Sequence, residues 1–345
     1  NRAIPCYCAG TWEINRNEDI MTMKINSFSF GATSAYLCTI NSGDNVMMDT
    51  GAEDDLTYDF GRKVNLHFNL NLTCLQGDFS KPLGKGVGFN VVDINTLHHN
   101  LKPYKEMMEK YGVPYTGGMF CTDRMKLKPY KKYCDEKYGK NNYQTWLGIR
   151  FDEPKRLVGD NKKKEFSAYK QLLSDGLDSE SISLLYVLAR KDIAELDQWK
   201  ISTLSKTLLK KRIDYLNKEN IMHLADISEF DKSDINEWWK NQSFKLQIEE
   251  HRGNCIFWPK KSNLKLAAAQ RDCPEQYEEF VNAIKSSSVR VDKNTGRYTK
   301  MYRGNQSLES LIATFDGSTG EEIKARIRGG KQLDTNSCSE SCEVF

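Results

Sequence analysis

The sequence has few prolines and no long uninterrupted run of apolar residues. Its 345 residues include 8 Pro and 23 Gly, proportions that exclude a fibrous or disordered chain. No stretch approaches the roughly 20 apolar residues that cross a bilayer, so we expect no membrane partner. The first twenty residues lack the apolar core of a signal peptide, which favours a cytoplasmic location.

A large excess of one charge is also missing. The 50 basic and 47 acidic residues give a formal net charge of +3, so bulk charge does not indicate a nucleic-acid-binding protein. His-Glu-x-x-His and Ser/His/Asp patterns are absent. The chain does have 39% hydrophobic residues, including 15 Phe, 16 Tyr and 6 Trp, which is enough for a packed core. Its ten Cys, in a cytoplasmic chain, favour free thiols, metal ligands or redox groups over a disulfide framework.

Short apolar runs alternate with helical patterns in the first part of the chain. Residues 24–28 and 45–48 have the composition of strands, and helical patterns follow them at 34–41 and 54–63. This rhythm predicts an α/β fold with a doubly wound, mostly parallel sheet. We further expect a strand over 64–72, where apolar and polar residues alternate, a mobile loop over 81–90, helices over 102–111 and 122–138, a strand over 146–150 and a helix over 263–284.

Changes of composition divide the chain into four parts. Residues 1–20 are expected to be an N-terminal extension, and 21–160 a nucleotide-binding α/β domain. The stretch 161–250, which opens with a run of lysines, is predicted to be a helical insert. Residues 251–345 form a C-terminal extension that contains cysteines.

The loop 29–34 between the first predicted strand and helix is a candidate phosphate site. Unpaired N–H groups at a helix start point outward, and the helix dipole favours an anion there. Thr33 and Ser34 add hydroxyl donors, and Gly31 lets a phosphate approach the backbone. The loop is not a Walker A motif, because it lacks the Gly-Lys pair. An ordinary strand–helix turn capped by Ser and Thr is the alternative.

Four segments of the chain, in order, resemble those of one family. Ser29-Phe30-Gly31 is similar to the Ser-Phe-Gly phosphate loop of phosphoadenosine phosphosulfate (PAPS) reductases, which belong to the PP-loop ATP pyrophosphatase superfamily. The segments 49–60, 121–129 and 147–156 resemble the family's Asp-Thr-Gly, Cys-Cys-x-x-x-Lys-x-x-Pro and Gly-Leu/Ile-Arg segments, with Thr122 in place of the second Cys. The segment 253–262 and the Cys-containing tail resemble members found in phages and mobile elements.

The resemblance implies an adenine nucleotide α-hydrolase-like fold that binds ATP or PAPS, with Mg²⁺ when ATP is bound. Arginine suits such ligands because its planar fork can bind two oxyanion oxygens. For Arg124 and Lys126, a solvated helix face is the alternative. The nucleotide-binding residues that the resemblance implies are Ser27, Ser29, Phe30, Gly31, Ala32, Thr33, Ser34, Asp49, Gly51, Lys126, Gly148, Arg150 and Arg156.

The resemblance also suggests roles for cysteines. PAPS reduction needs a nucleophilic thiolate and a thiol reductant, and the family pattern points to Cys342 as nucleophile and Cys338 as resolving thiol, with Asp49 as a further catalytic residue. The tail lacks the Gly, Leu and His of the reductase segment. Some family members hold an iron–sulfur cluster with two Cys pairs. In this sequence each of the two pairs keeps only one cysteine, so four thiolates for a cluster would have to come from Cys121, Cys255, Cys338 and Cys342.

Three functions therefore remain open at this point. The first is an enzyme of the PAPS reductase type that acts on an adenine sulfonucleotide. The second is an ATP-pyrophosphatase-type enzyme that adenylates a substrate for sulfur or amine transfer, with nucleic acid as one candidate substrate. The third is a protein that binds the nucleotide and has lost catalysis. A homo-oligomer is compatible with each of them.

Overall fold

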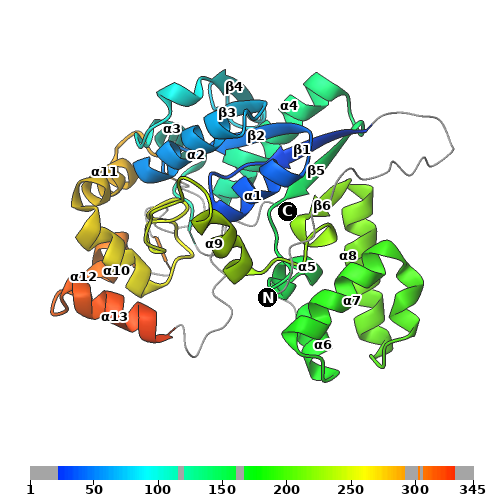
Figure 1. The fold of residues 1–345 in the computed structure, drawn as a ribbon. Coiled ribbons are helices and arrows are strands. Elements are labelled where there is room, and N and C mark those ends of the chain that lie inside the picture. Colours follow the sequence, from blue (N-terminus) through cyan, green and yellow to red (C-terminus); the bar gives the residue numbers. More distant parts are fainter. Residues whose placement is uncertain (1–21, 116–119, 161–166, 292–301, 304–305, 331–345) are drawn as a thin grey trace.

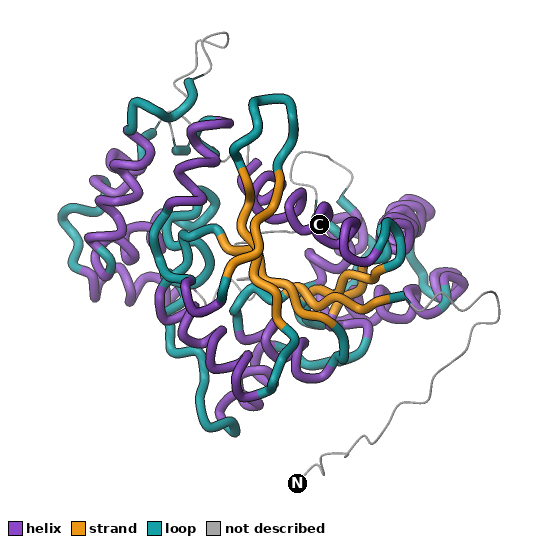
Figure 2. Tube along the Cα trace, turned by 90° about the horizontal axis from the view of Figure 1, so that it is seen from above, coloured by secondary structure: helices purple, strands orange, loops and turns teal. Residues whose placement is uncertain are grey.

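The centre of the molecule is one twisted six-stranded sheet (Figures 1 and 2). The computed structural model describes residues 22–115, 120–160, 167–291, 302–303 and 306–330. Across the sheet the strand order is β4-β3-β2-β1-β5-β6, and only the edge pair β3–β4 is antiparallel. The strands are β1 (Met23–Ser27), β2 (Asp44–Asp49), β3 (Leu72–Asp78), β4 (Gly88–Val92), β5 (Tyr143–Leu147) and β6 (Ile221–His223).

The chain starts in the middle of this sheet and builds it in both directions. It passes from β1 to β2 and β3 on one side, and later returns to place β5 and β6 on the other side of β1. The predicted doubly wound, mostly parallel α/β architecture is therefore confirmed. The reversal creates a switch point between the carboxyl ends of β1 and β5, which is where open α/β sheets bind their ligands.

Helices cover both faces of the sheet. Phe28, Met47 and Trp146 pack against α1 (Ala32–Ile40), α2 (Asp55–His67) and α9 (Lys232–Lys240), whereas Ile25 and Val46 pack against α4 (Lys128–Tyr138) on the opposite face. Most of the other helices form two groups, α10–α13 on one side and α6–α8 on the other (Figure 1). The α-helices are α1 (Ala32–Ile40), α2 (Asp55–His67), α3 (Lys102–Tyr111), α4 (Lys128–Tyr138), α5 (Pro154–Val158), α6 (Ala168–Ser174), α7 (Ser179–Lys191), α8 (Thr203–Lys218), α9 (Lys232–Lys240), α10 (Asn263–Asp272), α11 (Pro274–Lys285), α12 (Leu308–Ala313) and α13 (Gly320–Gly330).

The described residues also include four 3₁₀ or π-helical turns. Three of them, η1 (Ile94–Thr96), η3 (Ile193–Asp197) and η4 (Leu224–Asp226), are 3₁₀ turns. The fourth, η2 (Thr122–Leu127), is a π-helical turn that leads directly into α4. Such π turns within helices are frequent at functional sites. Among the described residues, no helix is long and apolar enough to cross a membrane.

The expected strand over 64–72 was wrong. Helix α2 continues to His67, and β3 begins only at Leu72. The alternation that suggested a strand does not mark a buried face, because Leu66 is 84% exposed. The inward face of α2 instead follows the helical period, with Tyr58, Phe60 and Val64 buried.

Three other boundaries differ from the sequence-based expectations. The expected loop over 81–90 gives way at Gly88 to β4, which pairs with β3. The helix expected over 263–284 is two helices, α10 and α11, since Pro274 cannot continue the hydrogen bonds of α10. The strand expected at 146–150 ends at Leu147.

The region 161–250 is joined to the sheet by a strand that the sequence did not reveal. The three residues of β6 pair in parallel with β5. Helices α6, α7 and α8 then form a hydrophobic core with the end of β5 and with α5. The expected extension at 1–20 lies outside the described residues.

Candidate functional site

The loop between β1 and α1 is organised by one serine hydroxyl. The Ser34 Oγ atom accepts a hydrogen bond from the Ser29 amide at 3.1 Å and lies 3.0 Å from the Ser29 hydroxyl. It also donates to the Gly31 carbonyl at 3.0 Å. Ser29 is exposed and Gly31 half-buried, so the loop is held from within and open to solvent outside.

Phe30 anchors this loop to the core. Its backbone is left-handed, with φ 59°, and its side chain is fully buried. The ring makes edge contacts with Phe28 and Tyr58, at centroid distances of 4.8 and 6.3 Å. A Cβ at Gly61 would lie 2.5 Å from the Phe30 ring, which explains the glycine in the middle of α2. Phe30 can therefore meet a ligand only through its backbone.

The N-terminus of α1 lacks the cap that other helices of the protein have. A Ser or Asp side chain accepts a first-turn N–H in α2, α6, α7, α8, α9, α10 and α12. A proline occupies the first turn of α3, α4, α5 and α11. Helix α1 begins at Gly31 with no side-chain cap, no proline and no acidic residue in its first turn. Its partial positive charge is thus left for an anion.

The carboxyl end of β5 lies directly against this helix terminus. A Cβ at Gly148 would lie 3.0 Å from the Ser34 N and Cα atoms, a contact so tight that a larger residue would have to push the backbone of α1 away. Two residues later, Arg150 donates from Nη1 to the Thr33 hydroxyl at 3.2 Å. The structure therefore brings together two segments, 29–34 and 148–150, that the sequence analysis assigned to one site.

A buried carboxylate orders the two predicted arginines. Glu153 accepts from the Arg150 amide at 2.8 Å and from Arg156 Nη1 at 2.7 Å. Asp152 accepts from Arg150 Nε at 2.7 Å. Arg150 is thereby fixed in orientation beside the loop, and Ser27 ends the neighbouring strand β1. The sequence analysis did not single out Glu153 as a site residue.

The exit of β2 is a saturated hydrogen-bond network. Asp49 is fully buried, and its carboxylate accepts from the Gly51 amide at 2.9 Å, the Tyr58 hydroxyl at 2.6 Å and Gln76 Nε2 at 2.7 Å. Gly51 has φ +70°, and a Cβ there would lie 2.8 Å from a Pro103 ring carbon. Asp49 therefore fixes the turn that follows β2.

Beyond this turn, a second buried carboxylate meets a lysine and a thiol. Glu53 Oε1 lies 3.8 Å from Lys126 Nζ and accepts from Cys255 Sγ at 3.7 Å. Burial raises the pKa of Glu53, and the positive charges of Lys126 and Lys261 act in the opposite direction. The sequence analysis assigned Lys126 to the nucleotide, whereas the structure turns it toward Glu53. No local pattern signals this grouping, because its members are far apart along the chain.

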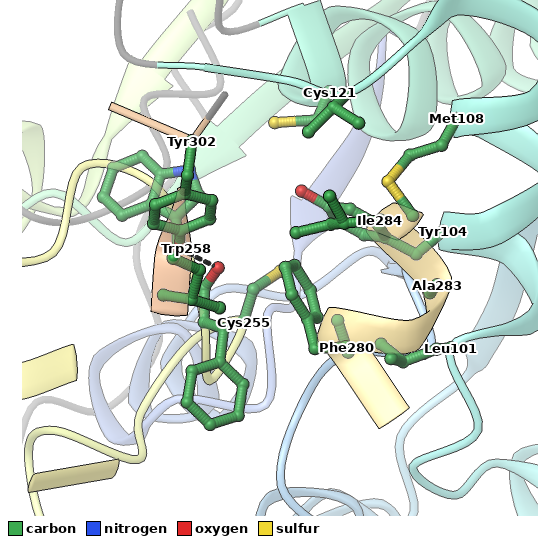
Figure 3. Packing of buried hydrophobic residues seen from close by; sticks show 14 of the residues in the cluster. Leu101, Tyr104, Met108, Cys121, Cys255, Trp258, Phe280, Ala283, Ile284 and Tyr302 are labelled. Atoms are coloured by element: carbon green, nitrogen blue, oxygen red, sulfur yellow. Dashed lines mark hydrogen bonds between the residues drawn. The ribbon is translucent and has the colours of Figure 1, made fainter. Parts of the chain in front are cut away.

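All six described cysteines are buried, and none of them forms a disulfide within the described part of the chain. Cys38, Cys74 and Cys134 lie in the hydrophobic core, and burial raises the pKa of the Cys74 and Cys134 thiols to about 12 and that of Cys38 further. Cys121 and Cys255 belong to one hydrophobic cluster with Trp258 and Tyr302 (Figure 3).

The described residues do not by themselves supply four thiolates at one place. Cys338 and Cys342, the predicted nucleophile pair and cluster ligands, lie outside the described residues. Trp258 occupies the position where the family pattern has a second Cys of the later pair, and Cys255 is engaged by Thr50 and Glu53. The iron–sulfur cluster stays a prediction.

A separate polar cluster surrounds His251. Its Nε2 atom lies 2.6 Å from Asp272 and 3.4 Å from Glu249, and this is the only described group with the spacing of metal ligands. Lys324 Nζ contacts the same two carboxylates at 2.9 and 3.1 Å. The ammonium group balances one of the two negative charges, and the cluster joins α13 to α10 as an ion network.

The fold and site define an α/β protein in which a helix without a side-chain cap, α1, starts at the switch point of a mostly parallel sheet. The sequence is 36% identical over 334 residues to the uncharacterized nin region protein ORF290 of Escherichia phage lambda, covering 94% of this chain and 95% of that protein. The chain belongs to the family of this phage protein. No family model matches the chain, and no solved structure matches it.

Proposed function

We propose that this chain is a PP-loop enzyme of the PAPS reductase type that binds an adenine sulfonucleotide. One observation carries the proposal: the uncapped N-terminus of α1 lies beside Arg150 at the switch point between β1 and β5. The doubly wound sheet supports the finer assignment to the adenine nucleotide α-hydrolase-like folds.

The donors at this point match the phosphates of a nucleotide. Backbone N–H groups of the loop and first turn supply hydrogen bonds and the positive end of the helix dipole. Thr33 adds a hydroxyl, and the Arg150 guanidinium adds a fixed charge next to it. Charge-assisted hydrogen bonds of this kind are about twice as strong as neutral ones, so a phosphate or sulfate ester is the ligand class that the site favours.

An ATP-pyrophosphatase-type enzyme is the second candidate. The same loop resembles the Ser-Gly-Gly-x-Thr/Asp-Ser form of that group, and α1 would hold the phosphates of ATP as well as those of PAPS. The two candidates differ in which bond of the nucleotide breaks. In the first, the sulfur–oxygen bond of the sulfo group breaks, and in the second the bond between the α and β phosphates breaks.

Two turnover assays on the full chain separate the candidates. Protein incubated with PAPS and a dithiol reductant should release sulfite, whereas release of pyrophosphate from ATP would identify the second type of enzyme. Tight nucleotide binding without either product would show a binding protein. If neither PAPS nor ATP binds in a calorimetric titration, both enzyme proposals fail.

A further inference from the structure

Basic side chains from three elements gather beyond the carboxyl end of β3. Lys81 lies in the loop that follows β3, Lys110 near the end of α3 and Arg124 in the π-helical turn η2. Lys81 is exposed, and Lys110 and Arg124 are half-buried. Lys110 is close enough to the other two cations for both to affect its titration. The fold therefore concentrates positive charge at a place that no run of basic residues in the sequence marks.

Tyr111 holds two of these cations in place. The Lys110 Nζ and Arg124 Cζ atoms lie 5.3 and 5.0 Å from the centre of its ring. The ring is itself fixed by edge contacts with Phe79 and Phe120, each at a centroid distance of 6.4 Å. Attraction between a cation and an aromatic ring offsets part of the repulsion between the two like charges. Two positive charges are thus fixed next to an aromatic ring at the surface.

Positive charge exceeds negative charge around Lys110. Burial is the largest cause that lowers the pKa of Lys110, and Arg124 and Lys81 lower it further, whereas Asp78 acts in the opposite direction. The net direction is downward. An anionic ligand would reverse this effect, because a negative charge next to an ammonium group stabilises its charged form. The group is therefore a candidate site for an anion.

The excess of positive charge continues to the start of α4. Asp123 Oδ2 lies 3.0 Å from Arg124 Nη1 and 3.1 Å from Lys128 Nζ, so one carboxylate is shared by two cations. Lys128 is the first residue of α4. Asp123 balances one of the two positive charges, and the other is left for a ligand.

The loop between β3 and β4, residues 79–87, extends this basic surface. Gly84 and Gly86 have φ +85° and +79°, and a Cβ at either would meet no atom within 4 Å. Lys85 between them is exposed. Lys110 Nζ donates to the Gly86 carbonyl at 2.8 Å, which joins the loop to the other cations. Because glycine lets a ligand come close to the backbone, a phosphate can approach the loop as well.

This surface lies on the same edge of the sheet as the start of α1. Strands β1, β2 and β3 are parallel neighbours, so their carboxyl ends share one edge. Adjacent strands are about 4.8 Å apart, which separates the ends of β1 and β3 by about 10 Å. An extended polyanion bound beyond β3 can therefore reach the end of β1.

We propose that Lys81, Lys85, Lys110, Arg124 and Tyr111 form a surface that binds single-stranded nucleic acid. The basic side chains contact successive backbone phosphates and displace condensed counterions. Bases stack on aromatic rings and on guanidinium planes, and Tyr111 and Arg124 offer one of each. A flexible single strand can follow cations that lie on three separate elements, whereas an acidic peptide would use the charges without the ring. This surface goes beyond the nucleotide site proposed above and does not depend on it.

Fluorescence anisotropy tests this surface directly. The full chain is titrated, without any nucleotide, into a labelled oligothymidylate of about 20 nucleotides at about 50 mM salt. The double variant Lys81→Glu with Lys85→Glu should bind at least about tenfold more weakly, and its affinity should depend less on salt. The control is Lys210→Glu with Lys211→Glu, an exposed pair on α8 whose replacement changes the net charge equally. The control should stay within about twofold of the wild type.

Two results of this titration would overturn the proposal. One is an equal loss of affinity in the two double variants, which would show that only the net charge matters. The other is a wild type that does not bind the strand at concentrations up to about 100 µM, the weak end of non-specific binding. Because no nucleotide is present, failure of PAPS or ATP to bind would leave this result unaffected.

Competition defines the class of ligand. A duplex of the same length and a poly-glutamate of similar charge are each added to the complex of the wild type with the labelled strand. The single strand should bind at least about fivefold more tightly than either competitor. A duplex that binds as tightly would assign the surface to double-stranded nucleic acid, and an equally tight poly-glutamate would assign it to an acidic protein. Either outcome overturns the proposal.

Discussion

The carboxyl ends of β1 and β2 lie side by side, and their hydrogen bonds are arranged in opposite ways. At the end of β1, helix α1 starts without a cap, and its loop is exposed at Ser29. At the end of β2, the buried Asp49 carboxylate already accepts from three donors of the protein. The end of β1 therefore offers backbone N–H donors to a ligand, whereas the carboxylate at the end of β2 is already bonded to donors of the protein.

This difference assigns ligand binding to the end of β1 and a structural role to the end of β2. Unused donors at a helix start suit an anionic ligand, whereas a saturated buried carboxylate mainly fixes the backbone around it. Tyr58 joins the two ends through Phe30 and Asp49. The rigid β2 exit thereby holds the loop in the shape that leaves its donors free.

The largest effect is expected from Asp49→Ala. This change leaves the donors of Gly51, Tyr58 and Gln76 buried without an acceptor, and we expect the free energy of unfolding to fall by about 3–5 kcal/mol. Urea unfolding measures it. Asp59→Ala on α2 is the control: its pair with Arg62 is exposed and should cost less than about 1 kcal/mol. Equal losses in both variants would show that the β2 exit is not a rigid support.

Gly148→Ala should have the next largest effect. Its new methyl group would press on the backbone of Ser34 and move α1 away from Arg150, which we expect to cost about 1–3 kcal/mol and to weaken nucleotide binding. Gly317→Ala is the control, because a Cβ there meets no atom within 4 Å. If Gly148→Ala and Gly317→Ala have the same melting temperature and the same nucleotide affinity, the close approach of β5 to α1 has no role in the site.

Glu53→Gln should have the smallest effect on folding stability, and it should change mainly how that stability depends on pH. Burial raises the pKa of Glu53 in the folded state above the ordinary glutamate pKa of about 4.3. As the pH rises past that ordinary pKa, the unfolded chain therefore loses this proton before the folded chain does. Folding stability from Glu53 is therefore fully present below that value and decreases as the pH rises toward the folded pKa.

Thermal melts between pH 4 and pH 8 test this effect. The wild type should lose stability relative to Glu53→Gln as the pH rises through that window. Glu237→Gln, at an exposed position, should follow the wild type. A constant difference between Glu53→Gln and the wild type at all pH values would show that burial does not raise the pKa of Glu53.

The parts of the site that are continuous in sequence could be predicted. Residues 29–34 follow a recognisable strand and open a helix, so local pattern marked this loop as a candidate, and the family resemblance added the turn at 49–51, which follows the next strand. Arg150 was also located, because it follows a short apolar run that does form β5. In parallel sheets the order of elements then places these segments at one edge.

Other features depend on contacts that no local pattern reveals. Cys255 and Glu53 are separated by 202 residues, and only the folded chain brings the thiol to the carboxylate. Strand β6 has three residues, too few for a period to be visible. The alternation at 64–72 misled because Leu66 is an exposed apolar residue on a helix, and a short run cannot distinguish it from a strand residue.

The most direct test of the central claim is a nucleotide titration of Thr33→Glu. A carboxylate in the first turn of α1 favours the helix dipole, so stability should be kept or raised by about 0.3–1 kcal/mol, while the negative charge occupies the anion site. Thr203→Glu adds the same charge to the first turn of α8, which also lacks an acidic residue there. We predict that Thr33→Glu loses PAPS and ATP binding in calorimetry and Thr203→Glu keeps it. Wild-type affinity in Thr33→Glu would contradict the assignment of the α1 terminus as the phosphate site.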